Sequence, residues 1–246
     1  MDDSLCSRVT IAFMSKKNTP RIFEMFPSQN YWDSVVHFAH LDLDAIELGY
    51  AEAAKRIANS VSGKEAYDDL VLIPFMFLWR HAIELSLKNQ IREALTLKSW
   101  TDATGATADL QRLTPILNSK HNLKVLFDEL QDLFAWHNLD KFPDEARKTL
   151  VWLADSDPTG QAFRYAGSAD NDQSHVDFPG LSTGLESTYR LISAGADILG
   201  ELAGYLEDEL EEERYAAAEA RAEFMAELEA ESNDELMTEI QSEPEG

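Results

Sequence analysis

Four ionisable side chains of different kinds stand within the most apolar stretch of the sequence. Arg80 and Glu84 are four residues apart, and His81 and Lys88 lie three and four residues from Glu84, so a helix would bring these groups together. Burying a guanidinium, an imidazole and a carboxylate costs free energy unless they pair. The spacing therefore predicts a polar network in the core or at its rim. Such a network either holds helices in register or forms part of a ligand-binding or catalytic site.

Two other segments carry candidate residues. His121 directly precedes Asn122 and Leu123, where it is either a helix-start residue, with Asn122 or Ser119 as the cap, or a functional one. Residues 155–165 place two aspartates in a turn ahead of an arginine that stands between aromatic residues. This turn is either closed by an internal salt bridge or serves as a clamp for a ligand. Its candidate residues are Asp155, Arg164 and Tyr165.

The signs of a metal or cofactor site are weak. His37 and His40 are three residues apart and close to Asp42 and Asp44, but two imidazoles without a third defined ligand are poor evidence for a metal centre. The sequence has no P-loop, GxGxxG, HExxH or GxSxG motif. Its single cysteine, Cys6, cannot form an intramolecular disulfide, which is typical of a reducing cytoplasm. We therefore expect a cytoplasmic protein that uses no metal and no cofactor.

Apolar residues recur every three or four positions along most of the chain, which is the period of an amphipathic helix. Residues 31–57 are predicted to form one long or two consecutive helices, and residues 60–63 break the pattern. A largely buried helix is predicted over residues 75–97, with Pro74 where a first turn tolerates proline. Residues 99–120, which contain Gly105 and Pro115, are expected to be a loop. Further helices are predicted at residues 121–137, 143–154 and 181–210.

These elements predict an all-α protein, an up-and-down bundle of five to six helices. No strand pattern is strong enough for a sheet, although short pairings around residues 163 and 176 stay open. We divide the chain into a leader at residues 1–27, a helical domain at residues 28–212 and an acidic tail at residues 213–246.

The charge is strongly acidic and concentrated at the C-terminal end. The 246 residues hold 45 acidic and 21 basic side chains, a formal net charge of −24, and this argues against duplex DNA as a partner. From Glu207 on, Ala, Glu and Leu predominate, which favours a helix that projects from the body and frays into a disordered end after Glu231. This tail either keeps the protein in solution or contacts a protein partner. The dense apolar run from Val71 to Trp79 is far shorter than the roughly 20 residues that a membrane helix needs.

Taken in order, several of these motifs resemble those of HEPN-like proteins, the higher eukaryotes and prokaryotes nucleotide-binding family. They are Pro74 with the run from Arg80 to Lys88, then His121-Asn122-Leu123, then Asp155 with Phe163-Arg164-Tyr165. The resemblance covers roughly residues 31–210. It implies an up-and-down helical bundle that often forms a homodimer and occurs in bacterial toxin, abortive-infection and phage-defence systems. Many members are metal-independent ribonucleases, so RNA or a nucleotide is an implied ligand.

The catalytic signature of that family is an arginine followed, after four to six residues, by a histidine. No arginine of this chain has a histidine at that offset, since His81 follows Arg80 directly and His121 lies nine residues after Arg112. We therefore favour a non-catalytic ligand- or partner-binding module of a defence or toxin–antitoxin type system. The alternative is a metal-independent endoribonuclease with a composite site of Arg80, His81 and His121, in which histidine moves the 2'-hydroxyl proton and arginine stabilises the phosphorane-like transition state.

Overall fold

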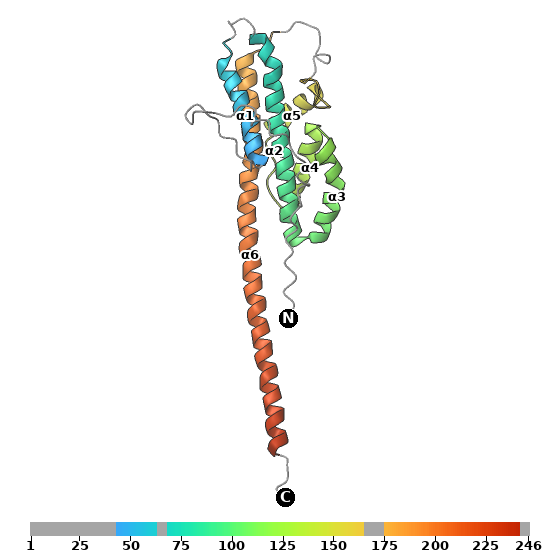
Figure 1. The fold of residues 1–246 in the computed structure, drawn as a ribbon, viewed down its shortest axis with the longest axis vertical. Helices are drawn as coiled ribbons and strands as arrows, with labels where there is room; N and C mark the ends of the chain where they lie inside the picture. The colour runs from blue at the N-terminus through green and yellow to red at the C-terminus, as the bar shows by residue number, and fades with distance from the viewer. Residues whose placement is uncertain (1–42, 63–67, 165–174, 242–246) are drawn as a thin grey trace, which may run out of the picture. The chain divides into compact units, whose positions relative to one another are not determined.

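The computed structural model describes residues 43–62, 68–164 and 175–241. This part of the chain is helical and has no strand, so the predicted all-α class is confirmed (Figure 1). The predicted leader and the histidines at positions 37 and 40 lie outside the described residues. In chain order the elements are α1 (Leu43–Ser60), the 3-10 helix η3 (Asp68–Val71), α2 (Leu72–Thr101), α3 (Ala103–Ser119), α4 (Leu123–Trp136), α5 (Asp144–Ser156) and α6 (Phe178–Gln241).

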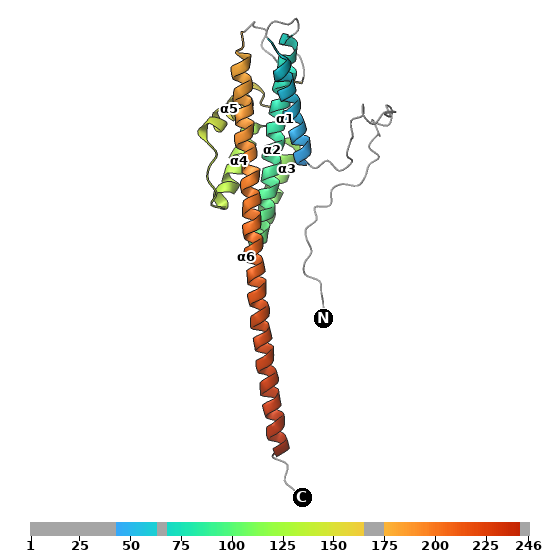
Figure 2. The ribbon, with the colours of Figure 1, turned by 90° about the vertical axis from the view of Figure 1, so that its left-hand side faces the viewer.

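Helix α2 is the core helix of the bundle. It contacts α1, α3, α4 and α6, and Figures 1 and 2 show it alongside α1 and α6. Its largest fully buried apolar side chains recur every four residues, in agreement with the helix predicted at 75–97. They are Phe75, Trp79, Ile83, Leu87 and Ile91. Pro74 is the third residue of α2, in the first turn, where a missing N–H leaves no helical hydrogen bond unmade.

One described segment, residues 68–101, is long and apolar enough to cross a membrane by length and composition. Half of its most apolar window is buried inside the structure. The core helix of a water-soluble bundle has the same length, composition and burial, so this segment carries no membrane assignment.

Residues 103–119 form helix α3, so the loop predicted at 99–120 is wrong. The side chain of Asp102 caps the helix by accepting a hydrogen bond from the Gly105 amide at 2.8 Å. Buried Leu113 and Leu117 hold α3 against the core. Threonine, glycine and Pro115 have a low intrinsic helix preference, which is why the sequence predicts a loop. In the folded chain, packing outweighs that preference.

Helices α4 and α5 begin close to where the sequence predicts. Asn122 caps α4 by accepting a hydrogen bond from the Val125 amide at 3.1 Å. Helix α5 begins at Asp144, directly after Pro143.

Helix α6 is continuous over 64 residues, from Phe178 to Gln241. The helix predicted at 181–210 and the acidic tail are therefore one element, and the predicted start of disorder after Glu231 is wrong as far as Gln241. The domain boundary expected between residues 212 and 213 falls inside this helix. Alanine, glutamate and leucine favour the helical state without a packing partner, which accounts for its continuation.

Candidate functional site

The guanidinium of Arg80 lies in the core and pairs with its own helix and with two other segments. Its side chain is 2% exposed, and its Nη1 donates to Glu84 Oε2 at 3.0 Å. Its Nη2 donates to the backbone oxygen of His121, ahead of α4, and to the backbone oxygen of Asp157, after α5, the latter at 3.1 Å. Its Nε lies 3.1 Å from Asp157 Oδ2, an ion pair in which neither atom has a hydrogen bond. Arg80 thus joins α2 to the chain segments that precede α4 and follow α5.

The turn after α5 closes over this guanidinium. Asp157 is 1% exposed, and its Oδ1 accepts the amides of Gln161 at 2.8 Å and Ala162 at 3.0 Å. Gly160 has a φ of +75°, in the left-handed region that favours glycine. A Cβ at this position would lie 2.8 Å from His121 Cβ and 3.1 Å from Arg80 Nη1. Both the backbone conformation and the close approach to Arg80 therefore require glycine here.

The carboxylate of Glu84 is shared by three partners. Oε2 accepts from Arg80, while Oε1 lies 2.8 Å from Lys88 Nζ and 2.8 Å from His121 Nδ1. Burial acts to raise the pKa of Glu84, but the hydrogen bonds from Lys88 and His121 and the positive charge of Lys88 outweigh it, and the pKa is lowered. Glu84 is accordingly ionised at neutral pH. We call Arg80, Glu84, Lys88, His121 and Asp157 the Arg80 network.

His121 is the most exposed side chain of the Arg80 network, at 37%. A carboxylate only accepts hydrogen bonds, so the contact with Glu84 places the ring proton on Nδ1. The other ring nitrogen, Nε2, makes no hydrogen bond within the described part of the chain and is not among its buried unpaired atoms. An imidazole held in this way by a carboxylate can accept a proton through Nε2.

His81 lies apart from the hydrogen bonds of the Arg80 network. Its ring meets Tyr50 of α1 edge-on, with centroids 4.4 Å apart, and stacks on Phe77 at 5.5 Å. Its Nδ1 is buried without a hydrogen-bond partner. Burial lowers the pKa of His81, against the opposing charge of Glu84 and helped by the positive charge of Arg164. His81 is therefore a neutral aromatic packing residue in this structure.

The third predicted segment contributes a different aspartate from the one expected. Asp155 is exposed at the end of α5, outside the Arg80 network, and the buried partner of Arg80 is Asp157. The signal that could have found Asp157 is the Asp157-Pro158-Thr159-Gly160 turn. In such a turn the first side chain accepts backbone amides that follow it, and the last residue takes a positive φ. Arg164 is exposed and lies over the Phe77 ring, with its guanidinium carbon 5.1 Å from the centroid. Tyr165 lies outside the described residues.

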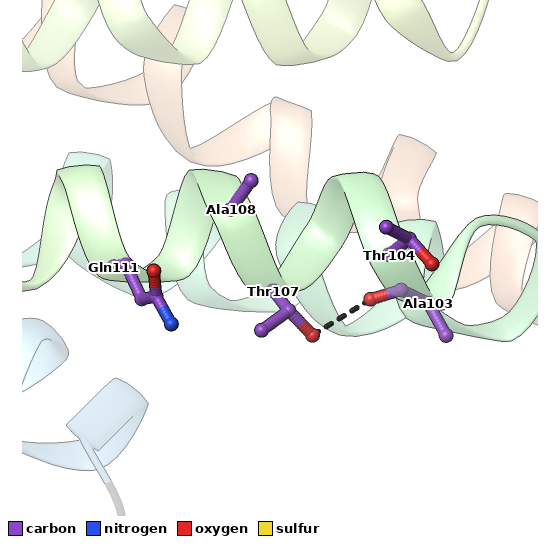
Figure 3. A pocket seen from close by; sticks show the side chains of 5 residues that line it. All are labelled: Ala103, Thr104, Thr107, Ala108 and Gln111. Atoms are coloured by element: carbon purple, nitrogen blue, oxygen red, sulfur yellow. Dashed lines mark hydrogen bonds between the residues drawn. The ribbon is translucent and has the colours of Figure 1, made fainter.

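Two further features of the described chain bear on its chemistry. The described residues contain no group of three or more His, Cys, Asp or Glu side chains placed to hold a metal ion. A surface hollow on α3 lies along one side of a single helix and has uncharged walls (Figure 3). It shares no residue with the Arg80 network, so it is not the candidate site. Its lining residues are Ala103, Thr104, Thr107, Ala108 and Gln111.

Comparison with models of protein families, with curated proteins and with solved structures finds no match to this chain. The HEPN-like resemblance therefore stays a prediction.

Proposed function

We propose that this protein is a HEPN-like helical module of a bacterial defence or toxin–antitoxin type system, which binds a partner or ligand without catalysing a reaction. The observation that carries the non-catalytic part is the closed pairing of Arg80. All three of its guanidinium nitrogens lie against protein oxygens, and 2% exposure leaves no face for a phosphate. An arginine that stabilises a phosphoryl transition state must contact the phosphate oxygens. Arg80 instead stabilises the junction of three segments.

The charge balance supports the same conclusion. Arg80 and Lys88 carry two positive charges, and Glu84 and Asp157 carry two negative charges, so these four groups cancel. The whole chain adds a repulsive field of net charge −24 toward polyanions such as RNA. A cleft that attracts RNA would need excess positive charge, which these four groups do not supply. The network is therefore suited to a structural role within a binding module.

The second candidate function is a metal-independent endoribonuclease with a composite site. One specific observation favours it, namely the half-exposed imidazole of His121 oriented by the Glu84 carboxylate at 2.8 Å. In this function Nε2 of His121 would take the 2'-hydroxyl proton, and the exposed Arg164 would contact the phosphate. His81, which is packed between aromatic rings, and the enclosed Arg80 would position the site without touching RNA.

A cleavage assay distinguishes the two candidate functions. Purified full-length protein is incubated with tRNA and mRNA beside His121→Ala and a matched control, His175→Ala, which changes an exposed histidine outside the Arg80 network. We expect intact RNA in all three reactions. Cleavage by the parent and by His175→Ala, but not by His121→Ala, would overturn the non-catalytic proposal and establish the ribonuclease. A melting-temperature screen of the parent against nucleotides then tests whether the module holds a small ligand.

A further inference from the structure

Helix α6 has two parts with different surroundings. Its first part packs against α1, α2 and α5 through residues that are at most 4% exposed, namely Leu185, Tyr189, Ile192 and Leu199. Beyond Leu210, every side chain described up to residue 228 is exposed. Figures 1 and 2 both show this second part of α6 running past the ends of the other labelled helices. Within the described structure, this second part of α6 is therefore exposed on all sides.

The apolar line that packs α6 into the bundle continues along the exposed part. Starting from buried Leu199, the next apolar residues on the same face follow at intervals of seven or four residues. Both intervals are close to a whole number of helical turns, so these residues stay on one side of the helix. We call Leu206, Leu210, Ala217, Phe224 and Leu228 the α6 seam. Phe224 is 59% exposed and Leu228 is 44% exposed. These two large apolar side chains are uncovered on a face whose earlier turns are buried.

The charge around the α6 seam restricts what can cover it. Residues 207–226 hold eight acidic and two basic side chains, a net charge of −6. Glu213 lies in the line of the seam, between Leu210 and Ala217. A second copy of this helix would add an equal negative charge and bring glutamate toward glutamate, which is unfavourable in a coiled-coil seam. A cationic surface would pair with Glu213 and with the flanking carboxylates.

We propose that the α6 seam binds a cationic amphipathic helix of a partner protein. The exposed part of the α6 seam, within residues 211–228, spans 18 residues, about 27 Å of helix at 1.5 Å per residue, and so offers a partner about five turns. Leucine-type side chains of the partner cover Phe224 and Leu228, and its lysines or arginines face Glu213 and the acidic flanks. This names the class of partner for the binding function proposed above and rests on that function for its biological use.

The probe for this surface is a synthetic 22-residue peptide with leucine at the a and d heptad positions and lysine elsewhere. Its control is a peptide of identical composition in scrambled order, which has the same charge and no apolar stripe. Binding of each labelled peptide to the full-length protein is followed by fluorescence anisotropy at 50 and 150 mM NaCl. We expect the patterned peptide to bind at least tenfold more tightly than the scrambled one at both salt concentrations, with a weaker affinity at higher salt.

A pair of variants then locates the contact. The double change Phe224→Ser and Leu228→Ser removes the apolar part of the α6 seam, and we expect it to weaken the patterned peptide at least tenfold. The control, Tyr215→Ser, removes an aromatic side chain that is 75% exposed on the opposite side of the helix. We expect this control to change the affinity less than twofold. Circular dichroism of each variant verifies that the helix content is unchanged.

Several results would overturn the inference. Equal affinity for the patterned and scrambled peptides would mean that charge alone attracts them, and equal losses in both variants would mean that the seam is not the contact. A parent protein that sediments as a dimer and becomes monomeric in the Phe224→Ser and Leu228→Ser variant would assign the α6 seam to a second copy.

RNA cleavage dependent on His121 together with peptide binding would refute the proposed function alone. Intact RNA without peptide binding would refute the seam alone.

Discussion

Replacing Arg80 by methionine keeps the length and apolar stem of the side chain and removes its charge. Asp157, which is 1% exposed and has Arg80 as its ion-pair partner, would then be left as an uncompensated buried carboxylate. Glu84 would keep its contacts with Lys88 and His121, so it would lose less stabilisation than Asp157. Removing one partner of a buried pair costs about 3–5 kcal/mol. For a chain of this size that corresponds to a fall in Tm of roughly 6–20 °C.

The matched control is Arg56→Met. Arg56 forms the same kind of pair with a glutamate four residues away, Glu52 at 2.9 Å, but the two side chains are 77% and 55% exposed. Solvent screens such a pair, so we expect a change of about 0.5 kcal/mol or less. Urea unfolding at pH 7, read by circular dichroism and by tryptophan fluorescence, gives both free energies. An Arg80→Met variant within 1 kcal/mol of the parent would refute the claim that Arg80 holds the three segments together.

A double-mutant cycle separates pairing from packing. If the loss in Arg80→Met comes mainly from the stranded carboxylate, adding Asp157→Asn should recover part of it, because the amide is neutral. We expect the double variant to be more stable than Arg80→Met alone. Additive losses would show that Arg80 acts through packing and not through its charge.

Three further predictions concern protonation and backbone shape. The pKa of Glu84 is lowered from its ordinary value of 4.5. The ionised carboxylate therefore stabilises the fold above pH 4.5, and this contribution is lost as the pH falls through the folded-state pKa. The difference in Tm between the parent and Glu84→Gln, measured against pH, should therefore shrink in acid. The pKa of Glu47, which is 7% exposed, is raised by burial and by the nearby Asp44, against a hydrogen bond from Asn89. Its protonated form contributes stability that is lost as the pH rises, so Glu47→Gln should raise the Tm at pH 7 and leave it unchanged at pH 4. Gly160→Ala should lower stability by about 1–3 kcal/mol through its positive φ and the contact with His121, whereas Gly204→Ala, where a Cβ meets nothing within 4 Å, should be neutral or stabilising by up to about 1 kcal/mol in urea unfolding.

Much of the helical framework could be predicted because helix periodicity is a local property. The apolar stripe from Phe75 to Leu97 is strong enough to place α2, and Asn122 marks the start of α4 in the expected way. Helix α3 could not be predicted on the same grounds. Its threonines, Gly105 and Pro115 disfavour a helix locally, and burial of Leu113 and Leu117 against the core reverses that preference.

For the candidate site, the contacts within one helix were accessible to sequence reasoning. Glu84 meets Arg80 and Lys88 because residues four apart share a face of any helix. The expectation that these groups form a polar network with remote segments is met by His121 and by Asp157. Asp155 was expected in the place that Asp157 takes, since the two differ only in how the chain turns after α5.

The sequence by itself therefore determined the all-α class, the central place of α2 and the need for buried charges on that helix to pair, because periodicity and the cost of desolvation act on short stretches of chain. Only the tertiary structure decided which partners they take. Arg80 meets the backbone oxygens of His121 and Asp157 across 41 and 77 residues of sequence, and no local pattern encodes those distances. It also decided that Arg80 is enclosed while the His121 imidazole is half exposed, because accessibility depends on how separate segments pack over a side chain.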